Sequence, residues 1–500
     1  MMSYEDPPQS KLFYMGINID KRIRKNHPLR KIRELIDFDF IYNEVKDKYG
    51  YNGNESIPPP VILKLMLLLV LYNVRSEREL MDTLSERLDW LWFLGFDLDT
   101  EIPNHSILSK ARRRWGEEAF RSFYERVVWQ CVESGLVDGR KIFVDSSLIQ
   151  ADASNNSVVD TQSLRRYLNE SYKELEKRLE EEGEDEEGDD EDDERGGVNK
   201  RYTSTTDPDA SIVRTGGSGK AKLRYQTHRA VDGAYEVITA TEVTPGEVNE
   251  AHMMVELIES HHRNTEIGAK TVVADSKYGT ISNYLGCYDR GIRAHIPDLN
   301  EVQIKGGRRA GIFSDDLFIY DGKTDTYKCP MGKRLRFRAF LTKRQSMEYI
   351  ASKKDCGVCE LRFKCTRNKI GRTIKRHLRQ EELDYMRYVA GTTVSKNDIK
   401  TRQHLMERSF ARSVRYGFER ARWRGLWRVR IQEYLTAAIQ NIQILMRYGT
   451  DPRLVVAVGK VNGEFHGKIT GVFKGVKKFL LDNFLLLKSG VEHRLVLKIS

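Results

Sequence analysis

Cysteine is scarce in this sequence, with six residues among 500. A count this low excludes a small secreted scaffold held together by disulfides. Long apolar runs are also missing, since the longest spans the eight residues from Leu65 to Tyr72, far short of the roughly 20 needed to cross a bilayer. No basic segment followed by an apolar stretch opens the chain, so no secretory signal is expected. We therefore expect a soluble intracellular protein.

The net charge conceals how basic most of the chain is. The sequence has 83 Lys and Arg against 73 Asp and Glu, a formal net charge of +10. Residues 180–194 alone hold 13 acids, which leaves 83 basic against 60 acidic side chains elsewhere. Such a basic body favours nucleic acid or another polyanion over a small metabolite as partner. A chain of 500 residues is long enough for about three domains.

The region from residue 58 to about 136 has helical periodicity. Residues 61–74 (VILKLMLLLVLYNV) are apolar almost all round, which predicts a buried central helix. Further on, a short helix, a basic turn and a long helix are expected, with Asn104 or Ser106 as the cap. Short helices with a basic face are typical of a helix-turn-helix DNA-binding module, and also of a helical bundle with a solvated face. The basic side chains concerned are Lys110, Arg112, Arg113 and Arg114.

From Gly139 onward, strand and helix patterns alternate. KIFVDSSLI predicts a strand, and KLRYQTHRAVD and AYEVITATEV, separated by Gly233, predict an antiparallel hairpin. A helix, the strand KTVVAD, a second helix and the strand RAHIP follow. This order predicts a mixed α/β sheet. Residues 160–200 are polar and then acidic, which is typical of a disordered insertion.

Three acids stand out by their positions. Asp145 lies inside a strand pattern, where a half-buried carboxylate costs free energy unless something binds it. Asp275 ends the strand KTVVAD, and Glu407 and Glu419 are the two acids among nine arginines in residues 402–430. Taken singly, each acid fits a cap or a salt bridge. Together, carboxylates from two strands and a helix form an oxygen ligand set of the kind that Mg²⁺ prefers.

Four of the six cysteines lie in a basic region without clear periodicity, residues 300–385. Cys356 and Cys359 have the spacing of zinc ligands, Cys329 lies in a CPMG turn, and five residues separate Cys365 from Cys359. Four thiolates suit a closed structural zinc site. The irregular spacing keeps a second interpretation open, in which these are unligated thiols in a small β insertion.

The order of these features resembles the DDE transposases of bacterial and archaeal insertion sequences. The likeness covers residues 15–448, and the most similar group is the IS eleven-eighty-two type, which has a cysteine-bearing insertion before the Glu. The segments that carry it are IPPPVILKLMLLLVLYNVRSERELMD, VDSSLIQADAS, STTDPDA, YQTHRAVD, VTPGEVNEAH, VVADSKYGT and MERSFARSVRYGFERARW with the residues up to AAIQNI.

The resemblance implies an α/β fold with an RNase H-like mixed sheet flanked by helices, an all-α N-terminal domain and a Cys-containing insertion. It implies that Asp145, Asp275 and Glu407 are the catalytic acids and hold two Mg²⁺ (or Mn²⁺) ions, with Glu419 as the alternative third acid. The implied activity is metal-dependent cleavage at the element ends, followed by strand transfer.

The implied partner is double-stranded DNA, both the terminal inverted repeats and the target, with at least a dimer in the synaptic complex and no membrane. The cytoplasm of a prokaryote, close to the nucleoid, is the expected location.

Trp423 is expected either to stack on a base of the DNA or to pack between helices. The expected DNA-binding residues are Lys110, Arg112, Arg113, Arg114, Arg408, Arg412, Arg415, Arg422 and Trp423.

Two other functions remain open, namely a catalytically inactive DNA-binding remnant or regulator, and a metal-dependent nuclease without strand transfer.

The expected division of the chain into domains is the same for all of these functions. It comprises a helical N-terminal DNA-binding domain at 1–136, the first part of the catalytic core at 137–299 with the acidic insertion at about 160–200, the Cys-containing insertion at 300–385, the C-terminal core helices at 386–450 and a tail of unknown role at 451–500.

Overall fold

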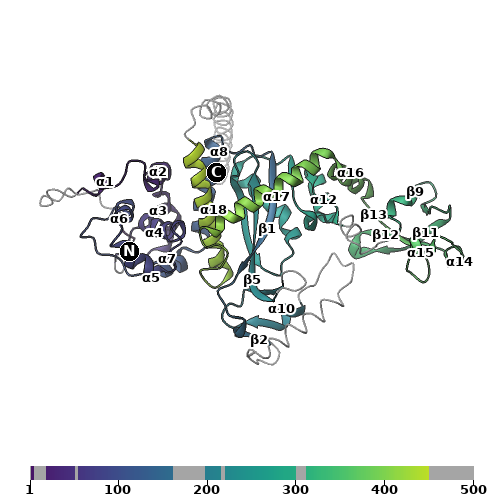
Figure 1. Cartoon of the computed structure of the whole chain (residues 1–500), viewed down its shortest axis with the longest axis horizontal. Coiled ribbons are helices and arrows are strands. Elements are labelled where there is room, and N and C mark those ends of the chain that lie inside the picture. Colours follow the sequence, from purple (N-terminus) through teal and green to yellow (C-terminus); the bar gives the residue numbers. More distant parts are fainter. Residues whose placement is uncertain are drawn as a thin grey trace, which may run out of the picture.

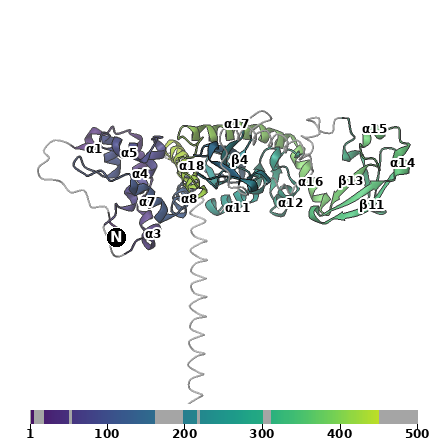
Figure 2. The same ribbon diagram turned by 90° about the horizontal axis from the view of Figure 1, so that it is seen from below.

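The computed structural model describes residues 2–4, 18–50, 55–160, 197–214, 220–299 and 311–449. Along its longest axis a group of helices comes first, a mixed sheet with its own helices lies in the middle, and a small sheet lies at the far end (Figures 1 and 2). The acidic run at 180–194 and the tail at 451–500 lie outside the described residues. Within the described ranges, no helix is long and apolar enough to cross a membrane.

The helical end is organised around α4 (Pro59–Leu71). Every residue from Pro59 to Val70 is buried, which confirms the predicted buried helix. At the start of α7 (Ser106–Trp115), the N-cap residue is His105 and not Asn104 or Ser106 as expected, although the side chain of Asn104 accepts a hydrogen bond from the backbone N–H of Ser106. The other helices here are α1 (Ile19–Arg22), α2 (Pro28–Leu35), α3 (Phe40–Val45), α5 (Glu77–Leu84), α6 (Leu88–Leu94) and α8 (Glu118–Glu133).

The central sheet is built on one long strand, β1 (Lys141–Gln150). β5 (Lys222–Asp232) runs antiparallel along one edge of β1, and β7 (Thr271–Val273) runs parallel along the other. β4 (Ser211–Val213) and β6 (Ile238–Pro245) pair antiparallel with β5, and β8 (Arg293–His295) pairs parallel with β7. The predicted hairpin and the predicted mixed sheet are both confirmed. A two-stranded sheet of β2 (Val158–Asp160) and β3 (Tyr202–Ser204) lies beside it.

Helices cover the two faces of this sheet. α17 (Thr393–Val414) crosses one face, and α11 (Met254–Thr265) and α12 (Ile281–Asp289) lie on the other (Figure 2). Side chains alternate between the faces of a strand, so Ile142 and Val144 of β1 join the core beneath α11 and α12. Asp145 therefore points to the face that carries α17. α16 (Gln380–Gly391) leads into α17.

The last described helix, α18 (Leu426–Tyr448), joins the helical end to the sheet. It packs against α8, α4 and β6, and its residues enter the same hydrophobic cluster as α4 and α8. Its buried Asn441 satisfies both backbone groups of Ile238 in β6, accepting from the N–H at 2.9 Å and donating to the carbonyl at 2.8 Å. One hydrophobic core thus spans the helical end and one side of the sheet.

A fully buried ion pair ties α18 to the sheet and to α17. Arg229 of β5 makes two parallel hydrogen bonds to Glu433 of α18, at 2.6 and 2.8 Å, and neither side chain is exposed. Thr241 of β6 donates a further hydrogen bond to Glu433, and Arg229 also reaches the Ser409 carbonyl of α17 at 3.3 Å. Every charged atom of the pair therefore has a partner, which a buried charge requires.

The Cys-containing insertion forms a separate five-stranded antiparallel sheet with the order β13-β12-β11-β10-β9. Its core is small, with six buried side chains that include Leu335 and Tyr349. The five strands are β9 (Ile319–Asp321), β10 (Thr326–Lys328), β11 (Arg334–Leu341), β12 (Ser346–Ala351) and β13 (Thr373–His377), and two short helices, α14 (Lys353–Gly357) and α15 (Arg362–Cys365), connect β12 to β13.

The buried pair gives a stability prediction. We expect Glu433→Gln to lower the free energy of unfolding by about 3–5 kcal/mol, because it leaves Arg229 buried without a counter-charge. Urea unfolding monitored by circular dichroism measures this change. The matched control is Glu259→Gln, which breaks an exposed pair with Arg290 and should cost less than about 1 kcal/mol. Equal effects of the two substitutions would contradict the role given to Glu433.

Candidate active site

Asp145 and Asp275 stand at the same level on two adjacent parallel strands. Phe143 of β1 pairs with Val273 of β7, and each acid lies two residues further along its own strand. Asp275 follows β7 with extended backbone and then caps a short 3-10 helix (Ser276–Tyr278), where its Oδ1 accepts a hydrogen bond from the Lys277 N–H at 2.9 Å. Matched positions on neighbouring strands place these two carboxylates side by side.

The surroundings of both carboxyls disfavour their charged form. Burial raises the pKa of Asp145 to about 6, with smaller contributions from the charges of Asp275 and Glu250, while Arg402 opposes the rise. The pKa of Asp275 is also raised, first by burial and then by Glu250, and Arg402 again opposes the shift. Carboxyls held close together in a partly buried place are typical of functional sites, and they favour binding of a cation.

The third acid that the structure brings to this place is Glu250, which sequence reasoning did not assign. Glu250 starts a short 3-10 helix (Glu250–Met253) after β6 and is buried. It accepts hydrogen bonds from the hydroxyl of Ser146 and from Gln226 Nε2, and it pairs with Lys277 Nζ at 2.7 Å. The signal for it was the segment VTPGEVNEAH, which contributes to the family resemblance and contains this acid directly after Asn249, the cap of the turn.

Helix α17 faces the two aspartates with an arginine. Arg402 Nη1 lies 2.5 Å from Asp145 Oδ2. Asp398, one turn earlier on α17, binds Lys141 Nζ at 2.8 Å and His295 Nδ1 at 2.7 Å, so it holds the helix to β1 and β8. Figure 1 shows α17 passing across β1. These contacts fix Arg402 above the carboxylate pair.

Glu407, the expected third acid, lies on the same helix but away from the two aspartates. It is exposed and accepts a hydrogen bond from Gln403 at 3.2 Å. It follows Arg402 by five residues, which is about 7.5 Å along a helix. Glu419, the alternative, is exposed as well and lies beyond the end of α17. The structure thus brings Asp145 and Asp275 together without either of these two glutamates.

The donor set beside Arg402 suits a hard divalent cation, since it consists of carboxylate oxygens with a hydroxyl nearby. In the ranges that the structure describes, no group of three His, Cys, Asp or Glu side chains is close enough to hold a metal ion. Ligation by three side chains therefore requires movement of a further carboxylate toward the pair.

One of the expected DNA-binding residues, Arg112, lies inside the protein, and the half-buried Trp423 packs against it. Arg112 is buried, forms an ion pair with Glu77 and lies over the ring of Trp423 with its guanidinium carbon 4.1 Å from the ring centroid. The indole N–H of Trp423 donates to the same Glu77 at 3.1 Å. Because Arg112 is buried, the expectation that it faces DNA is corrected. Both residues join α5 and α7 to the segment before α18, and base stacking by the half-buried Trp423 stays a prediction.

Arg422 belongs to the same junction. It donates hydrogen bonds to the side chain of Asn73 and to the carbonyl groups of Val74 and Tyr416. Its burial lowers the pKa of the guanidinium, which nevertheless stays charged because arginine starts from so high a value. Arg422 is half-buried, and a DNA contact for it stays a prediction. A polar cluster of Glu77, Arg112, Arg422 and Trp423, here called the junction cluster, thus links the helical end to the core.

The remaining expected DNA-binding residues lie at the surface. Lys110 and Arg113 are exposed on α7, and the exposed Arg114 lies over the ring of Tyr49. On α17 and just beyond it, Arg408 and Arg412 pair with Glu236 at 2.5 and 2.7 Å, and Arg415 is exposed. The expected DNA-binding residues at the surface are therefore Lys110, Arg113, Arg114, Arg408, Arg412 and Arg415.

The junction cluster gives a second prediction. Glu77→Gln should lower the free energy of unfolding by about 1.5–3 kcal/mol, because it removes the counter-charge of the buried Arg112. Guanidinium unfolding measures the loss, and limited proteolysis should show earlier cleavage between α8 and β1. The exposed Glu86→Gln is the control and should leave both unchanged. An unaltered unfolding midpoint for Glu77→Gln would contradict the junction.

Comparison with known families agrees with this architecture. Residues 17–114 match the family described as Transposase domain (DUF772), and residues 328–446 match the family described as Transposase DDE domain. The first match covers the helical end as far as α7, and the second runs from the end of β10 through β11, β12, β13, α16 and α17 to most of α18. The class defined by these matches is the transposases. Both matches are to transposase families, and together they support an insertion-sequence DDE transposase.

Among solved structures, the chain is similar to a piggyBac transposase synaptic complex with hairpin DNA, determined by cryo-electron microscopy. The two share 8% sequence identity, the alignment covers 84% of this chain and 74% of that chain, and the TM-score is 0.29. A comparison with curated proteins finds no match.

Proposed function

We propose that this protein cuts DNA at the ends of its own insertion sequence and joins the freed 3′-hydroxyl to target DNA. The observation that carries the proposal is the pair Asp145 and Asp275 at matched positions on adjacent parallel strands, in a chain that contains a transposase DDE domain. The strand order β6-β5-β1-β7-β8, antiparallel and then parallel, supports an RNase H-like core. The cysteine-bearing insertion before Glu407 supports membership of the IS eleven-eighty-two type group.

In this proposal Asp145 and Asp275 hold divalent metal ions, Mg²⁺ or Mn²⁺, and Glu407 completes the set as the family resemblance implies. Two such ions supply activation of a water or a 3′-hydroxyl and stabilisation of the leaving oxygen in phosphoryl transfer. The fit rests on the donor chemistry, because the aspartates are partly buried, carry raised pKa values and have acidic neighbours. A cation in this place would relieve the repulsion among the carboxylates.

Residues of the chain itself have assignable roles around the pair. Arg402 neutralises Asp145 in the structure, and on cation binding its guanidinium is released to contact a phosphate of the DNA backbone. Glu250 orients Ser146 and Lys277, so it fixes the strand and the turn that carry the aspartates. Lys277 is about two-thirds exposed, which leaves its ammonium able to reach a bound strand.

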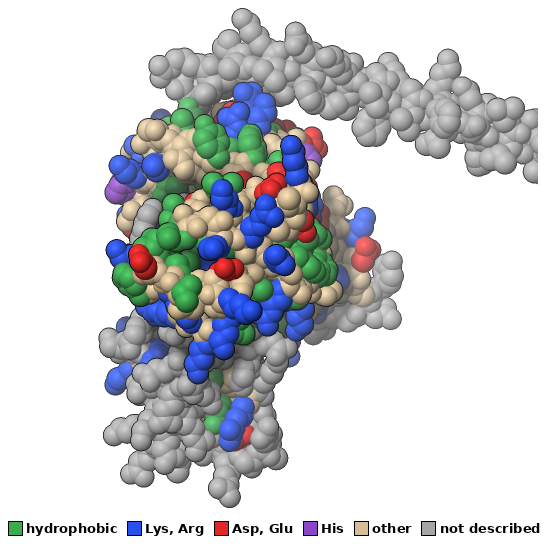
Figure 3. Space-filling view, turned by 90° about the vertical axis from the view of Figure 1, so that its right-hand side faces the viewer, with side chains coloured by type: hydrophobic (Ala, Val, Ile, Leu, Met, Phe, Trp, Pro, Cys, Tyr) green, Lys and Arg blue, Asp and Glu red, His purple; other side chains and the backbone are tan. Residues whose placement is uncertain are grey.

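The DNA would lie along the basic surfaces on both sides of this site. Exposed Lys110 and Arg113 of α7 are the proposed contacts with the element ends, and Arg415 beyond α17 is the proposed contact near the cut. At the opposite end, Figure 3 shows Lys and Arg side chains spread over the face of the insertion with few acids among them. Pairing two ends requires at least a dimer during the reaction. The proposed setting is the cytoplasm of a prokaryote.

The catalytic assignment predicts the outcome of a cleavage assay. The purified full chain is incubated with a plasmid carrying the DNA that flanks its gene, with Mg²⁺ or with chelator, and products are mapped by strand. Wild type should cut at the element ends only with metal, and Asp145→Ala or Asp275→Ala should abolish cutting while end binding persists, because each removes a metal ligand. Cutting that survives either change would exclude that residue from the mechanism.

The same assay separates the two candidates for the third acid. Glu407→Gln should abolish cleavage, whereas Glu250→Gln should weaken it and lower the thermal stability, because Glu250 is buried among hydrogen bonds. Full cleavage by Glu407→Gln with none by a folded Glu250→Gln would transfer the role to Glu250. Metal-dependent cuts without joined products would favour the nuclease alternative, and binding without cuts by wild type would favour the inactive remnant.

The proposed DNA contacts predict a change in salt dependence. Replacing Lys110 and Arg113 together by Gln should weaken binding of the element ends, and the slope of log K against log salt concentration should fall by about 0.9 for each lost phosphate contact. Fluorescence anisotropy at several salt concentrations measures both. Arg126→Gln, an exposed arginine on α8, is the control and should leave the slope unchanged. An unaltered slope in the double variant would remove α7 from the DNA interface.

A further inference from the structure

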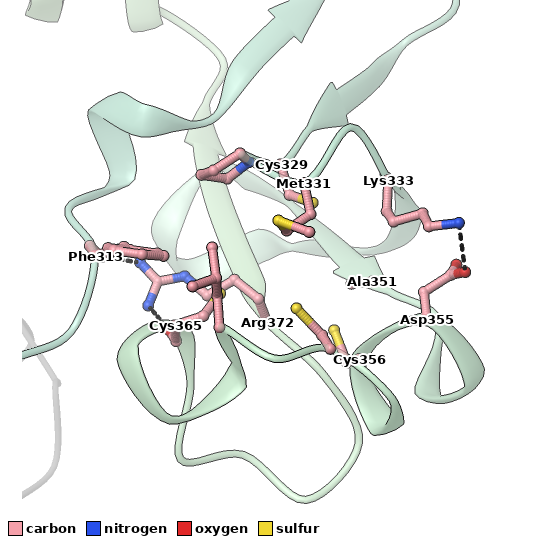
Figure 4. Close-up of a pocket in the computed structure, with 12 residues that line it drawn as sticks. Phe313, Cys329, Met331, Lys333, Ala351, Asp355, Cys356, Cys365 and Arg372 are labelled. Carbon is pink, nitrogen blue, oxygen red and sulfur yellow. Dashed lines mark hydrogen bonds and ion pairs between the residues drawn. The ribbon is translucent and has the colours of Figure 1, made fainter.

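The four cysteines of the insertion lie around one small pocket. Its wall includes Cys329 from the turn between β10 and β11, Cys356 of α14, Cys359 two residues beyond the end of α14, and Cys365 at the end of α15 (Figure 4). The pocket has a volume of about 30 Å³, more than the roughly 10–15 Å³ that one water needs, so it has room for an ion.

Chain turns present these thiols to the pocket. Cys329 begins a tight turn in which the Gly332 N–H donates to the Cys329 carbonyl and the Cys329 N–H donates to the Lys333 carbonyl, both at 2.8 Å. Gly332 has a φ of 74°, a left-handed conformation that glycine adopts without strain. The Cys359 N–H lies 3.5 Å from the Cys356 carbonyl. The structure thus contains one turn with a single cysteine and a second turn with a close pair.

Apolar packing alone holds α14 and α15 only weakly to the small sheet. Neither α14 nor α15 has a buried side chain, and the core beneath them has six buried residues. Units with so small a core usually need disulfides or a metal for stability. All four cysteines are free thiols, so the chain has no covalent link here.

The charges around the pocket suit four thiolates and a dication, a group with a net charge of −2. Lys333 and Arg372 both line the pocket. Arg372 is buried and donates to the Cys365 carbonyl at 2.8 Å, and Lys333 lies 3.8 Å from Asp355. Positive side chains beside a cysteine stabilise its thiolate, the form that binds metals.

We propose that Cys329, Cys356, Cys359 and Cys365 bind one zinc ion that holds α14 and α15 to the small sheet. This is a structural site, separate from the cleavage chemistry, since four thiolates close the tetrahedral coordination shell and leave no position for substrate. The described side chains do not bring three ligands within coordinating distance. Binding therefore requires the thiols lining the pocket to rotate toward its centre, with loss of their protons.

Zinc content of the full chain is the direct test. The protein is purified without chelator and its metal is measured by mass spectrometry; one zinc per chain is expected. Cys356→Ser with Cys359→Ser should bring zinc close to zero. The matched control replaces Cys131 and Cys287, which are buried in α8 and α12, and should keep the full zinc content. Wild-type protein with zinc well below one equivalent, unchanged after added zinc and dialysis, would overturn the proposal.

A second measurement covers the case in which the double variant does not fold. Wild-type protein is loaded with Co²⁺ in place of zinc, and the thiolate-to-cobalt charge-transfer absorption and the intense visible bands of a tetrahedral site are expected. In parallel, alkylation of the native protein should spare these four thiols until a chelator is added. Absence of the cobalt bands, together with alkylation of all four thiols at the same rate with and without chelator, would refute zinc binding. None of these readings depends on DNA cleavage.

Discussion

The buried pair of Arg229 and Glu433 is the contact on which the arrangement of the candidate site depends. Arg229 lies opposite Asp145 in the β1–β5 ladder, and its guanidinium reaches both α18 and the Ser409 carbonyl of α17. A charge in this place tolerates few alternative positions, because every shift of either helix would leave it without a partner. The pair therefore sets how α17 crosses β1, and thereby which of its residues stands over Asp145.

Two sets of contacts hold the helical end to the mixed sheet. α18 supplies apolar side chains to the core of the helical end and polar ones, Glu433 and Asn441, to the sheet. The junction cluster adds a second connection, in which one carboxylate, Glu77, serves both Arg112 and Trp423. Basic residues that the sequence suggests as DNA contacts form part of this connection between the helical end and the core. The exposed arginines of α7 and α17 remain candidates for the proposed contact with DNA.

Much of the architecture could be predicted from the sequence, because periodicity reports burial. The all-apolar stretch of α4, the β5–β6 hairpin around Gly233 and the mixed strand order are confirmed. The matched positions of Asp145 and Asp275 depend on the register of β1 with β7, which a strand pattern does not contain. Arg112 was misassigned because the sequence shows its charge but not its partner Glu77. Glu250 was missed since its neighbours Ser146, Gln226 and Lys277 come from other segments.

The central claim is that Asp145 and Asp275 together bind a divalent metal ion. The most direct measurement replaces Mg²⁺ by Fe²⁺ in the full chain and adds ascorbate and peroxide, so that hydroxyl radicals cut the backbone beside the bound ion, and the fragments are mapped by mass spectrometry. We expect cuts close to Asp145 and Asp275 that excess Mg²⁺ suppresses and that Asp275→Ala abolishes. Cuts confined to other segments, or cuts near these aspartates that persist in Asp275→Ala, would contradict the account.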